Sequence, residues 1–204
     1  MTSSFSTPEP AAPTHISGSV PVKIAVVNGS PSIPSKTGAL AHEIVERLSN
    51  KLPVDVRFIA VNDLVPFFSD SYGDPSSPIA TALATIADAD FLIAASPIYK
   101  GSYTGLFKHV FDLLPPSALA DKPVLLVATG GTERHTLALE HQFRPLFGFF
   151  QADTLPITIY GHDSEFENYK VVSAELDKRI DRAVLRALPF LSADLREASL
   201  YPSI

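Results

Sequence analysis

The sequence predicts one α/β domain built on a doubly wound parallel sheet of five strands, with helices on both faces. Two observations favour this fold class. Five short apolar runs alternate along the chain with five longer segments of helical periodicity. No internal repeat or linker interrupts this alternation over residues 21–192, and 204 residues, 46% of them hydrophobic, suffice for one buried core.

The first third of the chain contains two predicted strands and one helix. Residues 22–27 form a near-continuous apolar run rich in β-branched side chains, as expected of a strand covered on both faces. Apolar residues recur at helical spacing over 40–48, and Pro53 ends this helix. Residues 54–61 are the second predicted strand, and the Pro-, Ser-, Asp- and Gly-rich segment 66–78 is predicted to be a long exposed loop.

The middle of the chain repeats this order twice. A helix predicted over 79–86 leads into the third strand at 91–95. A second helix, over 106–113, stops before Pro115 and leads into the fourth strand at 124–128.

The last third of the chain supplies the remaining elements. Apolar residues over 139–150 are spaced as a helix that Pro145 interrupts, and 154–160 is the fifth predicted strand. Apolar residues at steps of four mark a final helix over 171–188. Five strands that alternate with helices most simply give the flavodoxin-like strand order.

Pro145 has a local consequence for its helix. It has no N–H, so the carbonyl of His141 loses its helical partner, and the proline ring also crowds that carbonyl. A one-residue π-bulge around His141 relieves both problems, and such bulges often lie at functional sites. The residues alone fit a simple proline kink equally well.

Charge and composition exclude several classes of function. The net charge of −6 comes without a basic stripe, which argues against nucleic-acid binding, and the absence of cysteine excludes disulfides and thiolate chemistry. Residues 1–20 carry no lysine or arginine and lack the apolar stretch of a signal peptide, so we expect a flexible leader. Residues 193–204 are expected to be a tail. No apolar run is long enough to span a bilayer, and we expect a cytoplasmic protein.

A hydroxyl-rich loop follows the first predicted strand. Gly29 permits close backbone approach, Lys36 adds a positive charge, and the next helix presents its positive N-terminal end. The hydroxyls belong to Ser30, Ser32, Ser35 and Thr37. Neither Gly-x-Gly-x-x-Gly nor Gly-Lys-Ser/Thr occurs, so the loop favours a terminal monophosphate over a pyrophosphate or triphosphate. A serine-rich N-cap loop without a ligand is the structural alternative.

The loop after the third predicted strand suits a flat aromatic ring. Tyr99 and Tyr103 offer ring faces or hydroxyls, while Gly101 and Gly105 let backbone amides approach the polar edge of a ring. The candidate ring-binding residues here are Pro97, Ile98, Tyr99, Lys100, Ser102, Tyr103, Thr104 and Gly105. A purely structural cluster of tyrosines at the strand end is the alternative.

A third turn, after the fourth predicted strand, would complete the site. Thr129, Gly130 and Gly131 fall at the same carboxyl edge of the sheet, where open α/β sheets bind ligands. A phosphate cradle beside a ring-binding loop points to flavin mononucleotide (FMN) as the cofactor. Positive potential for this anion would come from Lys36, Lys100, Lys108 and Arg134. A plain Gly-Gly turn is equally common.

Other chemistry finds little support. His135 and His141 lie six residues apart, on different faces of a helix, and no carboxylate stands at metal-ligand spacing with them. The sequence contains no Gly-x-Ser-x-Gly nucleophile elbow. We therefore expect neither a metal site nor a hydrolase.

Several stretches resemble the NAD(P)H-dependent FMN reductases that supply reduced flavin to sulfonate monooxygenases. The matching stretches are Asn28-Gly29-Ser30-Pro31, Pro34-Ser35-Lys36, Ser96-Pro97-Ile98-Tyr99-Lys100, Tyr103-Thr104-Gly105, Asp112-Leu113-Leu114-Pro115 and Ala128-Thr129-Gly130-Gly131-Thr132. They span most of the chain from Lys23 to about Asp163. The family commonly has a basic residue shortly after the position of Pro31, whereas this chain has Ser32 and Ile33 there, which leaves Lys36 as the cation.

The resemblance implies a mechanism and partners. FMN would bind by its phosphate at residues 30–37 and by its ring at 97–105, and NADH or NADPH would stack on the exposed flavin face. Hydride would pass to flavin N5 with no catalytic side chain required, and reduced FMN would leave for a sulfonate or sulfone monooxygenase. Two alternatives stay open from the residues: a quinone or azo-dye reductase that retains FMN, and a flavodoxin-like electron carrier.

The resemblance also bears on His141. Similar reductases place an inserted residue, often Tyr, at this position, in a π-helix at the subunit interface. It implies that His141 modulates flavin release and that the chain forms a homodimer or homotetramer. Four apolar residues are expected to pack against the other subunit: Leu139, Phe143, Phe147 and Phe150.

Overall fold

The computed structural model describes residues 20–70 and 74–192 and has the expected parallel sheet, ordered β2-β1-β3-β4-β5, with β6 also paired to β4. The strands are β1 (Val22–Asn28), β2 (Val54–Ala60), β3 (Phe91–Pro97), β4 (Pro123–Gly130), β5 (Asp153–Thr154) and β6 (Ile159–His162). The flavodoxin-like order is therefore confirmed. The predicted leader, apart from Val20, and the predicted tail lie outside the described residues.

The helices begin where the sequence offers hydroxyl caps. They are α1 (Lys36–Ser49), α2 (Val61–Leu64), α3 (Pro78–Asp88), α4 (Gly105–Asp112), α5 (Arg144–Phe149) and α6 (Ala174–Leu191). The side chains of Ser35, Ser77, Thr104 and Ser173 accept a backbone N–H from the first turn of α1, α3, α4 and α6. None of the described helices is long and apolar enough to cross a membrane.

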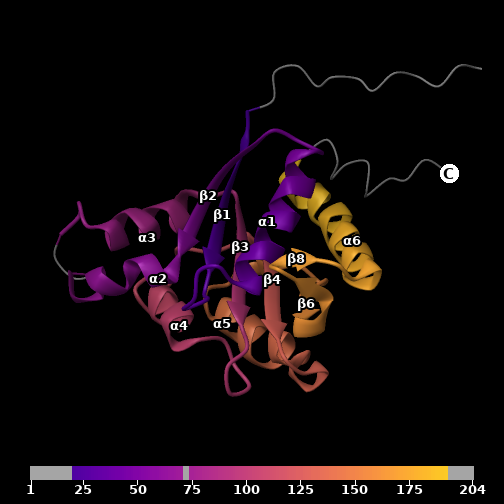
Figure 1. Cartoon of the computed structure of the whole chain (residues 1–204). Coiled ribbons are helices and arrows are strands. Elements are labelled where there is room, and N and C mark those ends of the chain that lie inside the picture. Colours follow the sequence, from indigo (N-terminus) through magenta and orange to yellow (C-terminus); the bar gives the residue numbers. More distant parts are fainter. Residues whose placement is uncertain (1–19, 71–73, 193–204) are drawn as a thin grey trace, which may run out of the picture.

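The alternation of side chains along the strands produces two buried layers. Ile24 and Val26 of β1 belong to a cluster with the inner faces of α1 and α6, whereas Ala25 and Val27 belong to a cluster with α3, α4 and α5. Figure 1 shows α1 and α6 lying together, away from α3 and α4. Because both faces are covered, the centres of β1, β3 and β4 are entirely buried.

The structure corrects three predicted elements. The fifth strand is not continuous over 154–160 but divides into β5 and β6 around Pro156, and both pieces pair with β4. The segment predicted to be a loop from residue 66 begins instead with a 3₁₀ helix (Val65–Asp70) directly after α2. The last helix starts after its cap Ser173, because Val171 pairs in a short hairpin of β7 (Phe166–Glu167) and β8 (Lys170–Val171).

The predicted π-bulge is confirmed. Residues Leu139–Phe143 form a π-helix just before α5, and the N–H of Arg144 donates to the carbonyl of Leu139, five residues earlier. The packing expected of this segment is wrong, however. Leu139, Phe143, Phe147 and Phe150 are buried in the core of their own chain and are not available to another subunit. Exposed apolar side chains near the π-helix come instead from Leu137 and Phe149.

Candidate functional site

The loops singled out from the sequence meet at the carboxyl edge of the sheet. In the strand register, Asn28 at the end of β1 pairs with Ala95 of β3, and Pro97 at the end of β3 pairs with Thr129 of β4. The N–H of Ile98 also donates to the carbonyl of Thr129 at 2.8 Å, which joins the second loop to the third turn. The predicted convergence of the three segments is thus present in the fold.

The first loop is shaped by its own polar groups. The N–H of Ser30 donates to the side-chain oxygen of Asn28 at 3.1 Å. The Ser30 hydroxyl donates to the carbonyl of Ser32 and accepts its N–H, while Ser35 Oγ accepts the N–H of Gly38 as the cap of α1. Part of the hydroxyl content that suggested a phosphate cradle therefore serves the loop and the helix cap. Ser32 itself is exposed.

The N-terminus of α1 brings charge to this edge. Helix geometry gives the N–H groups of Lys36 and Thr37 no acceptor inside the helix, so they are suited to an external anion. The Lys36 ammonium lies 3.2 Å from the carboxylate of Asp163, which follows β6. The hydroxyls of Thr37 and Thr129 are both buried and lie 2.6 Å apart, so they tie α1 to the end of β4.

Gly29 also has a packing role in the fold. A side chain there would place its Cβ 2.7 Å from the Phe107 ring and 2.9 Å from Cβ of Ser96. The glycine therefore lets α4 pack closely against the end of β1, and its close approach is to the protein interior. Gly105, at the start of α4, has open space around the position of a Cβ, so a ligand can approach the backbone there.

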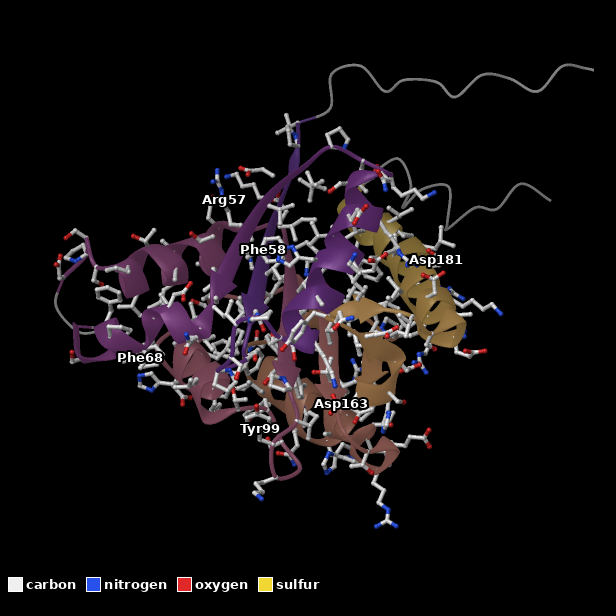
Figure 2. All side chains as sticks on the ribbon, in the orientation of Figure 1. Arg57, Phe58, Phe68, Tyr99, Asp163 and Asp181 are labelled. Carbon is white, nitrogen blue, oxygen red and sulfur yellow. The ribbon has the colours of Figure 1, made fainter. Side chains whose placement is uncertain are left out.

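The second loop is a tight hairpin with an exposed tyrosine. Tyr99 and Ser102 exchange backbone hydrogen bonds of 2.8 and 3.2 Å, and the two residues between them, Lys100 (φ 52°) and Gly101 (φ 85°), both have left-handed conformations, as in a type I′ turn. The side chain of Tyr99 is 52% exposed, and Figure 2 places it at the same end of the molecule as Asp163. An exposed aromatic face is thus held on a well-defined turn.

Tyr103 and Thr104 are less exposed than Tyr99 and contact neighbouring parts of the protein. The Tyr103 ring lies 5.3 Å from Phe143 and 5.6 Å from Phe107, and partial burial raises the pKa of its hydroxyl. Thr104 donates its hydroxyl to the carbonyl of Gly29 at 2.7 Å and accepts the N–H of Phe107. Both residues therefore help to hold the loop in place.

The π-helix reaches this second loop. The hydroxyl of Ser102 donates to the side-chain oxygen of Gln142 at 3.2 Å, and the neighbouring Phe143 packs on Tyr103. The irregular turn around His141 is therefore in direct contact with the candidate ring site, although the His141 side chain itself is exposed. Sequence reasoning did not single out Gln142, because the partner of an exposed amide depends on the tertiary fold.

The third turn is braced by residues that follow β5. The Tyr160 hydroxyl donates to the carbonyl of Thr132 at 2.6 Å, and it also fills the space where a Cβ of Gly130 would lie. Burial raises the pKa of this tyrosine. The carboxylate of Asp163 lies 3.3 Å from the Cβ position of Gly131. Tyr160 and Asp163 were missed, although their place within and just after the last strand of the same sheet was a usable signal.

These features fit a ligand with an anionic end and a flat ring. One edge of the sheet carries a helix N-terminus with Lys36, an exposed tyrosine on a tight turn and open space at the backbone of Gly105. Within the described ranges, no group of three His, Cys, Asp or Glu residues is placed to hold a metal ion.

Comparison with known proteins decides the family. The family model described as NADPH-dependent FMN reductase matches residues 22–164, which include all three converging segments. The chain belongs to this family. An FMN reductase (NADPH) of Pseudomonas aeruginosa is 46% identical over 171 residues, covering 83% of this chain and 92% of the relative.

Two further proteins agree with this assignment. An NADH-dependent FMN reductase, SfnF, of Pseudomonas fluorescens is 43% identical, covering 86% of this chain and 95% of that protein. The crystal structure of an NADH:FMN oxidoreductase in its apo form superposes with a TM-score of 0.77 at 32% identity, covering 84% of this chain and 90% of that one. This FMN reductase is therefore an NAD(P)H-dependent flavin oxidoreductase, as the sequence indicated.

Proposed function

We propose that this FMN reductase holds the FMN phosphate at residues 30–37 and the flavin ring between the Tyr99 hairpin and the turn at Gly130 and Gly131. The proposal rests on one observation: the N-terminus of α1 with Lys36 meets the two ring-binding segments at a single edge of the sheet. An anion at a helix N-terminus is stabilised by the free N–H groups and by the helix dipole.

The residues of the chain bind and orient, and no side chain has to move a proton. The flavin, when bound, supplies the hydride chemistry with NADH or NADPH. Lys36 and the first turn of α1 neutralise the phosphate, while Tyr99 offers its exposed face to the ring. Thr104 fixes the loop through Gly29, so the backbone beside Gly105 keeps its place.

Positive charge near the ring favours turnover with anionic substrates over a role as an electron carrier. Lys100 and Arg134 are both exposed, whereas Lys108 forms an ion pair with Asp112 and contributes less than the sequence implied. We propose that FMN exchanges as a substrate and that its reduced form passes to a sulfonate or sulfone monooxygenase. The family resemblance and the exposed position of this edge support that route.

We further propose that the protein assembles as a homodimer or homotetramer through the surface around the π-helix. Leu137 is 61% exposed and Phe149 is 67% exposed, and both lie within the chain segment that carries the exposed His141. Light scattering on a Leu137→Glu, Phe149→Glu variant tests this: a smaller particle than wild type is expected, and an unchanged mass contradicts it.

A binding experiment tests the phosphate site directly. Lys36→Met should weaken FMN binding about 10- to 100-fold, because a charge-assisted hydrogen bond contributes about 1.5–3 kcal/mol. Riboflavin, which lacks the phosphate, should bind the variant and the wild type alike. Ser35 is left in place because it caps α1, and Lys178→Met on the exposed face of α6 is the matched control for charge.

Kinetics then test the use of FMN as a substrate. The rate of NAD(P)H oxidation is measured while the concentration of free FMN is varied, and saturation with FMN is expected. Oxidation that instead requires an added quinone would contradict the proposal and favour an enzyme that retains its flavin.

A further inference from the structure

One acidic side chain stands inside the candidate phosphate site, where an anion is unfavourable. The Asp163 carboxylate lies 3.2 Å from the ammonium of Lys36 on one side. On its other side it lies 3.3 Å from the Cβ position of Gly131, in the turn assigned to the flavin ring. Asp163 thus bridges the phosphate end and the ring end of the site, and its side chain is 49% exposed to solvent.

The backbone that carries Asp163 is held in place. His162 and Glu165 form a reciprocal capping box around it, with the N–H of His162 donating to the Glu165 carboxylate at 2.8 Å. Glu165 in turn accepts two hydrogen bonds from Arg179 of α6 and one from Ser173. The carboxylate of Asp163 is therefore presented from a fixed turn.

The two neighbouring acids differ in how their charges are balanced. Glu165 is neutralised by Arg179, which contacts both of its oxygens. In the described part of the chain, the one cation paired with Asp163 is Lys36, which is also the residue proposed to bind the phosphate. A phosphate that enters the site must therefore share or replace this ion pair, and its negative charge comes close to a second one.

We propose that Asp163 competes with the FMN phosphate for Lys36, and so keeps the affinity for FMN low enough for the flavin to exchange. This inference rests on the proposed phosphate site. The effect of Asp163 is confined to ligands that carry the phosphate, because a flavin without a phosphate does not bind Lys36. Asp163 thereby sets how strongly the enzyme prefers FMN over riboflavin.

The test removes the charge and keeps the shape. In Asp163→Asn, FMN should bind about tenfold more tightly and dissociate correspondingly more slowly, while riboflavin affinity changes less than about twofold. Asp181→Asn is the matched control. Asp181, on α6, is also an exposed carboxylate, and it pairs with Arg47 of α1 at 2.6 Å. Figure 2 shows Asp181 far from Asp163. The control should leave FMN affinity unchanged. Fluorescence titration and stopped-flow release measure both quantities.

The outcomes separate this inference from the function on which it rests. If neither the wild type nor Asp163→Asn prefers FMN over riboflavin, the phosphate site itself is wrong. If the wild type prefers FMN but Asp163→Asn binds FMN no more tightly, Asp163 is not a competitor and only this inference falls. Asp163→Ser repeats the measurement with a second neutral side chain, and thermal melting checks that both variants fold. Weaker FMN binding in both would show instead that Asp163 positions Lys36 for the phosphate.

Discussion

The buried pair of hydroxyls between α1 and β4 gives a sharp prediction. Thr37 and Thr129 are 1% and 3% exposed, and their oxygen atoms are 2.6 Å apart although 92 residues separate them. Replacing either one by valine keeps its size but leaves the other hydroxyl buried with its partner removed. Replacing both by valine leaves no buried hydroxyl that needs a hydrogen-bond partner.

The expected magnitudes follow from the cost of an unsatisfied buried group. Each single variant, Thr37→Val or Thr129→Val, should lose about 1–3 kcal/mol of unfolding free energy. The double variant should lie within about 1 kcal/mol of wild type, because two valines fill the same space without an unpaired hydroxyl. For a chain of this length, a loss of about 2 kcal/mol lowers the melting temperature by about 4–8 °C.

Urea unfolding of the apoprotein, followed by circular dichroism, measures all four corners of this cycle. The single variants should unfold at lower urea with unchanged slope, and the double variant should recover. Single variants as stable as wild type, or a double variant whose loss equals the sum of the two, would refute a coupled buried pair.

Three further predictions concern the site and its supports. Tyr103→Ala should cost about 2 kcal/mol of stability because its ring contacts are lost. Replacing the exposed Tyr99 by alanine should leave the melting temperature nearly constant and raise the dissociation constant for FMN, and equal losses of stability in the two variants would contradict this division. Gly29→Ala should cost about 1–3 kcal/mol in urea unfolding because its Cβ meets Phe107, and full stability would disprove that close packing. Deletion of His141 should give a folded protein that binds FMN more tightly and turns over more slowly, because the π-turn that contacts the ring-binding loop becomes regular. Wild-type turnover together with an unchanged oligomeric state would count against this prediction.

The features that were predictable from sequence depend on local rules. Apolar runs and helical spacing identified the strands and helices, and their alternation dictated the sheet order. Pro145 marked the place of an irregular turn because its missing N–H affects only the preceding turn, and the family resemblance favoured a π-bulge over a simple kink there. Pro156 could have indicated the break in the fifth strand by the same logic.

The features that escaped prediction depend on contacts between distant segments. The cap formed by Ser35 is local, and the sequence left it open beside a phosphate because a hydroxyl before a helix suits both. Gly29 is required by Phe107, and the ion pair of Lys36 with Asp163 joins two residues that are far apart in sequence. Neither Phe107 nor Asp163 is near its partner in sequence, so residue type alone could not assign these contacts.

The two irregularities of the fold are joined by one guanidinium. Arg144, directly after the π-helix, pairs with Glu140 at 2.6 Å, and it donates to the hydroxyl of Thr154 and the carbonyl of Leu155 at 2.7 and 3.1 Å. Leu155 lies where the fifth strand breaks. Straightening the π-turn would turn Arg144 about the helix axis and leave the Leu155 carbonyl without this donor, so a change to the helix is expected to reach the strand break as well.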